Sequence, residues 1–405
     1  MNSFCGIVLA YCDDEECNVP VTQASLLFKS VSLWAYETLK KTGIKDVCIC
    51  GSVNNVDEYN ELGIEVFSEE GELSSAKALK CSLDFLKKNI EKNVFIASAF
   101  VPYWAEKSLK EAVSFYNEEG NPLALCVYQE GENANGAVVG LIISAKELIL
   151  QIEKGCSIGE IALNSNKIPV VCKRLRNSAG VKALSDILRS KIIENHINDG
   201  VYIPCSDGVI IGPDVLIEVG TTILSGTILK GKTKIGAGCF IGPNSFVSDS
   251  EFANNVSFKA SFAEHSFVGE GTAVGPFCNL RPNSNLGKGV KVGDFVEVKN
   301  SNIGDKTAIA HLTYVGDSDV GCGVNFGCGT VTVNYDGKKK SRTVIGDNVF
   351  IGCNSNFIAP VRVENNSYIA AGSTITDNVP ENSLAIARSR QIIKENWVTK
   401  KNDKY

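Results

Sequence analysis

The chain has 405 residues, more than twice the roughly 150 of an average domain, so we expect two or three domains. Hydrophobic residues make up 44% and charged residues 21%, which excludes general disorder, and the net charge of −6 argues against a nucleic-acid partner. The longest apolar runs, such as residues 138–144, are too short to span a bilayer, and no signal peptide opens the chain, so we expect no membrane association.

The first 200 residues alternate strand and helix signals. Apolar runs rich in β-formers predict strands at residues 4–11, 47–50, 94–99 and 123–128. Helical periodicity predicts helices at residues 25–41, 75–88, 105–116 and 181–195. This alternation predicts a mostly parallel sheet with helices on both faces.

A six-residue period begins after Gly200. Aliphatic residues recur at Ile211, Ile217 and Ile223, and the pattern continues with slips to Ile375, often with a glycine next in sequence. Such a period predicts a left-handed parallel β-helix of hexapeptide repeats, because each aliphatic side chain then points into one narrow prism. We expect the glycines to supply unusual backbone angles at the corners. A sandwich of irregular strands, the alternative, would not hold a fixed period over this length.

Two segments depart from the period. Residues 334–343 are polar and basic, and we expect them to form a loop that projects from the prism, where function often lies. Residues 389–405 carry Trp397 and four lysines, which predicts a C-terminal helix and basic arm that reaches a neighbouring active site or else a frayed terminus. The predicted domains are therefore residues 1–200, 201–388 and 389–405.

Cysteine and histidine usage limits the chemistry. There are 15 cysteines, an odd number, and none forms a Cys-x-x-Cys motif, so we expect neither a disulfide framework nor a zinc site. Most cysteines should be small core residues in a reducing cytoplasm. The three histidines are His196, His265 and His311, and the first lies outside the repeats, which excludes a three-histidine metal site in the β-helix.

Six segments of the second half match one family closely: LRP at 280–282, GDFVEVK at 293–299, HLTYVGD at 311–317, VNFG at 324–327, NYDG at 334–337 and AIAR at 385–388. With them, residues 279–397 resemble the acetyltransferase half of the bifunctional N-acetylglucosamine-1-phosphate uridyltransferase / glucosamine-1-phosphate N-acetyltransferase family. The order of the halves is also similar. The resemblance implies a Rossmann-like α/β nucleotidyltransferase-type domain followed by a left-handed parallel β-helix.

The resemblance implies a role for each matched position. His311 would be the general base that takes a proton from the sugar's 2-amino group, and Glu297 would orient it. Asn334 and Tyr335 would position the substrate and the acetyl donor. The sugar-phosphate clamp would consist of Arg281, Lys299, Tyr314, Asn325 and Lys340.

The acetyl-CoA wall implied by the family carries two cysteines here. Cys353 stands at the position of the oxyanion donor, where serine is usual, and a backbone N–H donor would be preserved by cysteine. Cys328 replaces an alanine. Ala371 and Arg388 would complete the contacts with coenzyme A, the latter as a cation beside a phosphate.

The first half departs from the family at its catalytic positions. Residues 9–17 contain four carboxylates in place of the family's glycine-rich, basic loop for the triphosphate. Phe100 replaces the aspartate that ligates magnesium, Lys182 replaces the second ligand, and Ser74-Ser75 replace a Gly-Thr pair. We therefore expect no Mg²⁺ and no uridylyl transfer, and a structural, oligomer-supporting or regulatory role for this domain.

The sequence thus predicts acetyl-CoA-dependent N-acetylation of glucosamine-1-phosphate, which feeds UDP-N-acetylglucosamine and hence peptidoglycan and cell-wall synthesis. The resemblance also implies a cytoplasmic homotrimer with sites between neighbouring prisms. Two alternatives stay open: an acyltransferase for a related amino-sugar phosphate, and a non-catalytic trimeric binding or regulatory protein.

Overall fold

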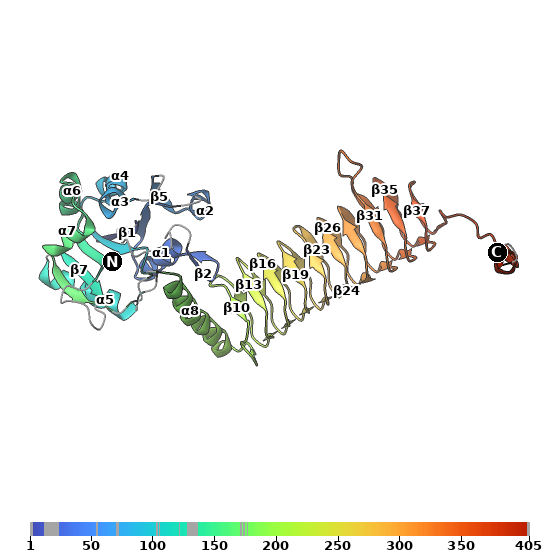
Figure 1. The fold of residues 1–405 in the computed structure, drawn as a ribbon, viewed down its shortest axis with the longest axis horizontal. Coiled ribbons are helices and arrows are strands. Elements are labelled where there is room, and N and C mark those ends of the chain that lie inside the picture. Colours follow the sequence, from blue (N-terminus) through green and yellow to red (C-terminus); the bar gives the residue numbers. More distant parts are fainter. Residues whose placement is uncertain are drawn as a thin grey trace. The chain divides into compact units, whose positions relative to one another are not determined.

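The computed structural model describes residues 3–11, 24–53, 56–69, 73–102, 104, 106–120, 122–127, 137–170, 172, 175 and 177–402. The chain forms two compact units, Met1–Ser190 and Lys191–Tyr405, so the division falls before the predicted boundary at residue 200 (Figure 1). No helix in these described ranges is long and apolar enough to cross a membrane.

The first unit contains a seven-stranded sheet in the order β5-β4-β1-β6-β8-β7-β9. Its strands are β1 Phe4–Ala10, β4 Asp46–Gly51, β5 Glu65–Ser68, β6 Asn93–Ser98, β7 Leu123–Val127, β8 Ala137–Ser144 and β9 Asn166–Pro169. Only β8 runs antiparallel to its neighbours, which confirms the mostly parallel sheet. From β1 the strand order first extends to β4 and β5 on one side and then continues with β6 on the other. The position between β1 and β6 is therefore the switch point of the sheet, the place where α/β folds bind ligands.

Helices cover both faces of this sheet, as predicted. The helices are α1 Val31–Lys41, α2 Val56–Glu61, α3 Ser75–Cys81, α4 Leu83–Lys88, α5 Glu106–Glu119, α6 Ala145–Glu153, α7 Ile158–Leu163 and α8 Ser178–Asn198. On one face, alternate residues of β1 share a buried cluster with α3, α4, α6 and α7. On the other, a Cβ added to Gly6 would lie 3.2 Å from Leu39 of α1, and Phe4 packs edge-on against Tyr116 of α5.

Two of the predicted helices have different bounds in the structure. The helix expected from residue 25 starts at Val31, because the Ser30 hydroxyl accepts a hydrogen bond from Leu33 N at 3.2 Å and caps it. The residues before it form a hairpin of β2 (Ser25–Leu26) and β3 (Lys29–Ser30). The helix expected at 75–88 is divided at Ser82, whose hydroxyl donates to Leu79 O at 2.6 Å.

The second unit is the predicted left-handed parallel β-helix, a prism with three parallel sheets that we name by their first strands. The β10 face comprises β10 Ile210–Ile211, β13 Ile228–Lys230, β16 Phe246–Ser248, β19 Phe262–Glu264, β22 Asn279–Leu280, β25 Glu297–Lys299, β28 Tyr314–Gly316, β31 Val331–Val333, β34 Asn356–Ile358 and β37 Thr374–Ile375. The β11 face comprises β11 Leu216–Ile217, β14 Lys234–Ile235, β17 Glu251–Phe252, β20 Phe267–Val268, β23 Ser284–Leu286, β26 Ser301–Ile303, β29 Ser318–Val320, β32 Thr343–Ile345 and β35 Val361–Val363. The β12 face comprises β12 Thr222–Ile223, β15 Phe240–Ile241, β18 Ser257–Phe258, β21 Ala273–Val274, β24 Lys291–Asp294, β27 Ala308–His311, β30 Asn325–Phe326, β33 Phe350–Ile351, β36 Tyr368–Ile369 and β38 Leu384–Ala385.

Most strands direct one apolar side chain into the prism, as the six-residue period predicts, whereas β31 buries Thr332 instead. Ile211, Ile223 and Leu229 are fully buried. Where the period slips, Phe252 and Phe258 fill the core, with ring centroids 5.0 Å apart. Phe252 and Phe258 lie on consecutive strands of one coil, β17 and β18, so their rings meet inside the prism where the repeat is irregular.

Some corner glycines, those that follow the inward-facing aliphatic residue, are required for a different reason from the one expected. Gly304 and Gly352 do not have positive φ; instead, a Cβ on either would lie closer than 3.0 Å to the backbone of the next coil. The left-handed conformation belongs to a later corner residue, such as Asn348 (φ 56°) or Asn354 (φ 55°). Close stacking of the coils therefore accounts for these two glycines, while others, such as Gly220 (φ 77°) and Gly238 (φ 67°), take the unusual angles that were expected.

The expected loop interrupts the coils between β31 and β32, where it projects from the prism (Figure 1). It is a short hairpin closed by an antiparallel bridge between Tyr335 and Lys340. Beyond β38 the chain ends in a short helix, α9 (Trp397–Asn402).

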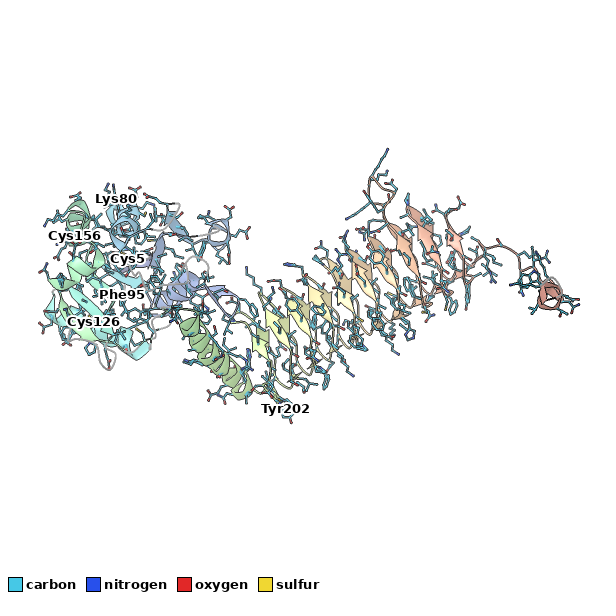
Figure 2. All side chains as sticks on the ribbon, in the orientation of Figure 1. Cys5, Lys80, Phe95, Cys126, Cys156 and Tyr202 are labelled. Carbon is cyan, nitrogen blue, oxygen red and sulfur yellow. The ribbon has the colours of Figure 1, made fainter. Side chains whose placement is uncertain are left out.

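Fewer cysteines are buried than the sequence predicts. Among the 13 cysteines in the described ranges, all are free and six are buried: Cys5, Cys48, Cys50, Cys126, Cys239 and Cys278. Cys5 and Cys126 lie on strands of the first unit (Figure 2). Cys322 and Cys353 are exposed, because they follow corner glycines where the side chain lies outside the prism. Cys12 and Cys17 lie outside the described residues.

Candidate functional site

A histidine–carboxylate pair lies at the corner between the β12 and β10 faces. His311 ends β27 and Asp294 ends β24, and the strand register places them side by side. His311 Nδ1 lies 2.9 Å from Asp294 Oδ1. This hydrogen bond lowers the pKa of Asp294, so the carboxylate stays ionised and holds the proton on Nδ1. The Nε2 lone pair of a neutral His311 is then left to act as a base.

Glu297, the residue expected to orient His311, has another partner. It begins β25 on the β10 face, beside Tyr314 rather than His311. Its Oε1 accepts a hydrogen bond from Arg281 Nη1 at 2.9 Å, which raises the pKa of Arg281. The structure therefore corrects the expected partner of His311 from Glu297 to Asp294. The reason is geometric, because residues stacked in register on successive coils are closer than residues separated by a corner.

Four expected clamp residues gather on and beside the β10 face. Arg281 and Lys299 are neighbours in successive coils, since Leu280 pairs with Val298. The ring of Tyr314 lies over Gly316, where any side chain would overlap it. Lys340 reaches this face from the projecting loop. Its ammonium group lowers the pKa of Lys299, both by direct contact and by its positive charge. Two adjacent cations form a site suited to a dianion such as a phosphate.

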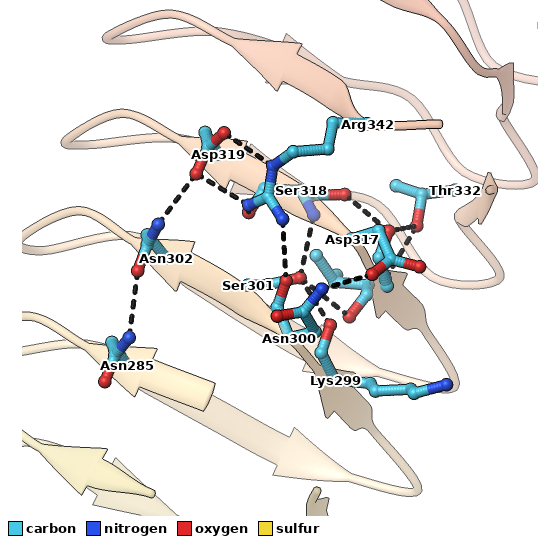
Figure 3. Close-up of polar contacts among 12 residues, drawn as sticks. Asn285, Lys299, Asn300, Ser301, Asn302, Asp317, Ser318, Asp319, Thr332 and Arg342 are labelled. Carbon is cyan, nitrogen blue, oxygen red and sulfur yellow. Dashed lines mark hydrogen bonds and ion pairs between the residues drawn. The ribbon is translucent and has the colours of Figure 1, made fainter. Parts of the chain in front are cut away.

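A buried carboxylate, that of Asp317, lies next to this cluster. Asp317 is only 5% exposed and accepts hydrogen bonds from the side-chain amides of Asn300 and Asn334. Burial raises the pKa of Asp317, but these bonds and the charges of Lys340 and Lys299 outweigh it, so the net shift is downward. Figure 3 shows Asn300 and Lys299 beside Asp317. The Asn334 amide also donates to the Tyr314 hydroxyl at 3.4 Å.

The expected acetyl-CoA residues form a column on the same corner as His311. Ile309 pairs with Phe326, which puts Cys328 one coil beyond His311. Asn354 N donates to Cys328 O and Gly372 N donates to Cys353 O, both at 2.8 Å, so the column continues through Cys353. Ala371 lies on the next coil, after β36, and Arg388 follows β38. His311 thus stands at one end of a column that holds every predicted contact with coenzyme A on the β-helix except those of the loop.

The backbone of Cys353 is a candidate oxyanion donor. In the described part of the chain, no hydrogen bond from its N–H is found. A Cβ on Gly327 would lie against this nitrogen, so the glycine leaves it uncovered. An unpaired N–H two coils from His311 is the kind of group that stabilises charge on a thioester oxygen.

Two predicted residues lie apart from these clusters. Asn325 begins β30 and projects from the β12 face, around the corner from the clamp. Tyr335 is exposed on the first strand of the projecting loop, opposite Lys340. A single chain therefore presents the expected sugar-phosphate residues on two faces of the prism.

In the first unit, aromatic rings occupy the ends of the central strands. Tyr11 follows β1 and Phe100 follows β6, and their ring centroids lie 5.9 Å apart in a T-shaped contact. Both are buried. Lys182 lies on α8, where it is exposed and bonds Asp186 at 2.6 Å, and Ser74 precedes α3 as its N-cap residue. The carboxylate-rich segment 12–17 lies outside the described residues.

Sequence reasoning assigned no role to Asp294 or Asp317. Both stand in the matched segments, and each lies 17 positions from a residue that it contacts, His311 or Asn334. The signal that would have found them is the coil length, because residues one coil apart stack side by side.

Comparison with known proteins agrees with the fold. Residues 342–377 match the family model described as bacterial transferase hexapeptide (six repeats). A Bifunctional protein GlmU of Clostridium acetobutylicum is 36% identical over 90% of this chain and 91% of its own length. One from Clostridium botulinum strain Langeland is 34% identical over 98% of both chains. A third, from Clostridium novyi, is 48% identical over 62% of this chain, a match that spans 54% of that relative.

Proposed function

The chain belongs to the family of bifunctional GlmU proteins, and on that premise we propose that its β-helix transfers the acetyl group of acetyl-CoA to the 2-amino group of glucosamine-1-phosphate. The observation that carries the proposal is the Asp294–His311 pair, which stands at the head of the Cys328–Cys353 column and next to the cation-rich β10 face. A base, a thioester wall and a phosphate clamp are the three parts that this reaction needs. The product would enter UDP-N-acetylglucosamine and peptidoglycan synthesis.

The proposed reaction is a direct transfer. His311 Nε2 takes a proton as the amine nitrogen attacks the thioester carbonyl carbon. The negative charge on the carbonyl oxygen is stabilised by the backbone N–H of Cys353. The carbon–sulfur bond then breaks, and the thiolate of coenzyme A recovers the proton from the imidazolium. Asp294 stabilises that imidazolium, because its own pKa is held below the ordinary value.

The clamp would hold the sugar phosphate by charge and shape. Lys299, Lys340 and Arg281 would bind the phosphate, while Glu297 fixes the guanidinium of Arg281 through their 2.9 Å hydrogen bond. Since Asn325 projects from a different face, we propose that it contributes to the site of a neighbouring copy. A homotrimer with sites between prisms is consistent with this division, and the tail that carries Arg388 and α9 would reach the same site.

The first unit, in this proposal, no longer transfers uridylyl groups. Tyr11 and Phe100 fill the place between β1 and β6 where a nucleotide and its Mg²⁺ would be expected to bind. An aromatic ring supplies none of the oxygen ligands that Mg²⁺ prefers. This supports a structural, oligomer-supporting or regulatory role for the unit.

Substrate choice tests the proposed function against its alternatives. We expect coenzyme A release from acetyl-CoA with glucosamine-1-phosphate, and a kcat/KM at least about tenfold lower with glucosamine-6-phosphate, because the phosphate then misses the clamp. Free coenzyme A is quantified by chromatography. A preference for the 6-phosphate would favour the related acyltransferase. No release with either sugar would leave the non-catalytic trimeric binding protein.

A further inference from the structure

Arg342 ends the projecting loop and forms a dense set of hydrogen bonds to the β11 face. Its Nε donates to Asp319 Oδ2 at 2.8 Å and its Nη2 to Asp319 Oδ1 at 2.7 Å, a bidentate ion pair. The same guanidinium donates to Asn300 O at 3.1 Å and to Ser318 O at 3.0 Å. Figure 3 shows Arg342 over Asp319 and Ser318. Arg342 is not among the site residues predicted from the sequence, and the reaction proposed above makes no use of it.

The loop is therefore held at both of its stems by one short segment. At the first stem, Asn334 donates to Asp317, and at the second stem Arg342 binds Asp319. Asp317 and Asp319 flank the buried Ser318. Within the loop, Ser341 N donates to Asn334 O at 2.9 Å, so the two stems are joined to each other.

Asp319 is in turn fixed by the coils beneath it. Asn302 Nδ2 donates to Asp319 Oδ1 at 2.7 Å, and Asn285 Nδ2 donates to Asn302 Oδ1 at 3.0 Å. This ladder crosses the β11 face over three successive coils (Figure 3). Hydrogen bonding to Arg342 lowers the pKa of Asp319, which keeps the carboxylate charged. The second stem thus rests on the rigid part of the prism.

The loop needs such an anchor because Lys340, which pairs with Tyr335 across the hairpin, brings one cation toward another. Lys340 lies two residues before Arg342, and its ammonium group is close enough to Lys299 to lower the pKa of that side chain. In the absence of a bound anion, the two charges repel each other. A flexible loop would relieve the repulsion by moving Lys340 away from the β10 face.

We propose that Arg342 is a positioning residue that, through its fork on Asp319, holds Lys340 beside Lys299 and so builds the two-cation site for the substrate phosphate. This inference rests on the proposed function for the identity of the ligand, a sugar phosphate. Arg342 would thus affect selectivity for the phosphorylated sugar without contacting the reacting atoms.

The anchoring can be tested without the reaction. In Asp319→Asn the fork loses its charge but the loop keeps Lys338, Lys339 and Lys340 as trypsin sites, so we expect faster cleavage there than in the unchanged full-length chain. Arg362→Ala is the matched control, because Arg362 forms an ion pair with Glu364 on the same face, at 2.6 Å, on the coil after the loop, and none of its side-chain hydrogen bonds is to the loop in the described residues. Equal cleavage rates in all three proteins would overturn the anchoring.

The positioning is tested by comparing glucosamine-1-phosphate with unphosphorylated glucosamine as acetyl acceptors. Arg342→Ala is expected to lower the ratio of their kcat/KM values by about tenfold to a hundredfold, through the phosphorylated sugar alone. Arg342→Lys should recover only part of the ratio, since an ammonium group cannot form the fork. Arg362→Ala should keep the full ratio.

A double variant shows whether Arg342 acts on phosphate binding through Lys340, by its own contact with the phosphate, or by a general loss of structure. If Arg342 acts through Lys340, the ratio in Lys340→Ala/Arg342→Ala should equal that in Lys340→Ala alone. An additional tenfold loss in the double variant, or an unchanged ratio in Arg342→Ala, would overturn the proposal. If the unchanged chain acetylates neither sugar, the proposed function fails, and the tryptic comparison still decides whether Arg342 anchors the loop.

Discussion

Replacing His311 with alanine is expected to lower kcat for acetyl transfer by roughly 10²–10⁴-fold, the usual contribution of a positioned general base. His311 is the one histidine on the corner that carries the Cys328–Cys353 column; His265 follows β19, at the corner between the β10 and β11 faces, and His196 lies on α8. The KM for acetyl-CoA should change little, because His311 stands at the end of the column. Steady-state release of coenzyme A measures both constants.

Two carboxylate variants sharpen this test. Asp294→Asn should lower kcat, because the amide no longer stabilises the imidazolium through the 2.9 Å contact with Nδ1. Glu297→Gln should chiefly raise the KM for glucosamine-1-phosphate, because it weakens the partner of Arg281. A kcat loss in Glu297→Gln with none in Asp294→Asn would show that the expected partner was right and the contact in this structure is not the catalytic one. Unchanged turnover in His311→Ala would remove its role altogether.

Replacing Phe258 with alanine is expected to lower the free energy of unfolding of the β-helix by about 3–5 kcal/mol. Phe258 is fully buried and packs against Phe252 at 5.0 Å, where the coils depart from the regular repeat. The strand of Phe258, β18, pairs in register with β15 on one side and β21 on the other, so the cavity has few ways to collapse. Urea unfolding followed by far-ultraviolet circular dichroism measures the loss.

Phe267 provides the matched control for this prediction. It lies on the β20 strand with its ring outside the prism and is 40% exposed. Phe267→Ala should cost about 1 kcal/mol or less, as surface substitutions do. Equal losses in the two variants would contradict the assignment of Phe258 to the core.

The fold was predictable because its buried apolar residues recur at regular intervals in the sequence. Ile211, Ile223 and Leu229 face the prism at the positions that the six-residue period assigns, and the alternation of apolar runs and helices predicted the first sheet. The period could not place Phe252 or Phe258, since shortened coils shift the inward position. Ser30 sets the start of α1 and Ser82 divides the helix predicted at 75–88, each with a single hydrogen bond that a periodicity of apolar residues does not report.

The site was predictable as a set of residues and less so as a set of contacts. The matched segments named His311, Arg281 and Lys299, and the structure brings the latter two together on one face. The partner of His311 was missed, because its identity depends on the number of residues in one coil. Arg342 was missed for a related reason: its partner Asp319 lies across an insertion whose length hides the stacking.

We propose that the full chain acetylates glucosamine-1-phosphate at the His311 corner and carries out no uridylyl transfer. One incubation with glucosamine-1-phosphate, acetyl-CoA, UTP and Mg²⁺, with the sugars identified by mass spectrometry, tests it most directly. We expect N-acetylglucosamine-1-phosphate and an equal amount of free coenzyme A, with no UDP-N-acetylglucosamine. Absence of the acetylated sugar would contradict the role of the β-helix, and formation of UDP-N-acetylglucosamine at a comparable rate would contradict the role given to the first unit.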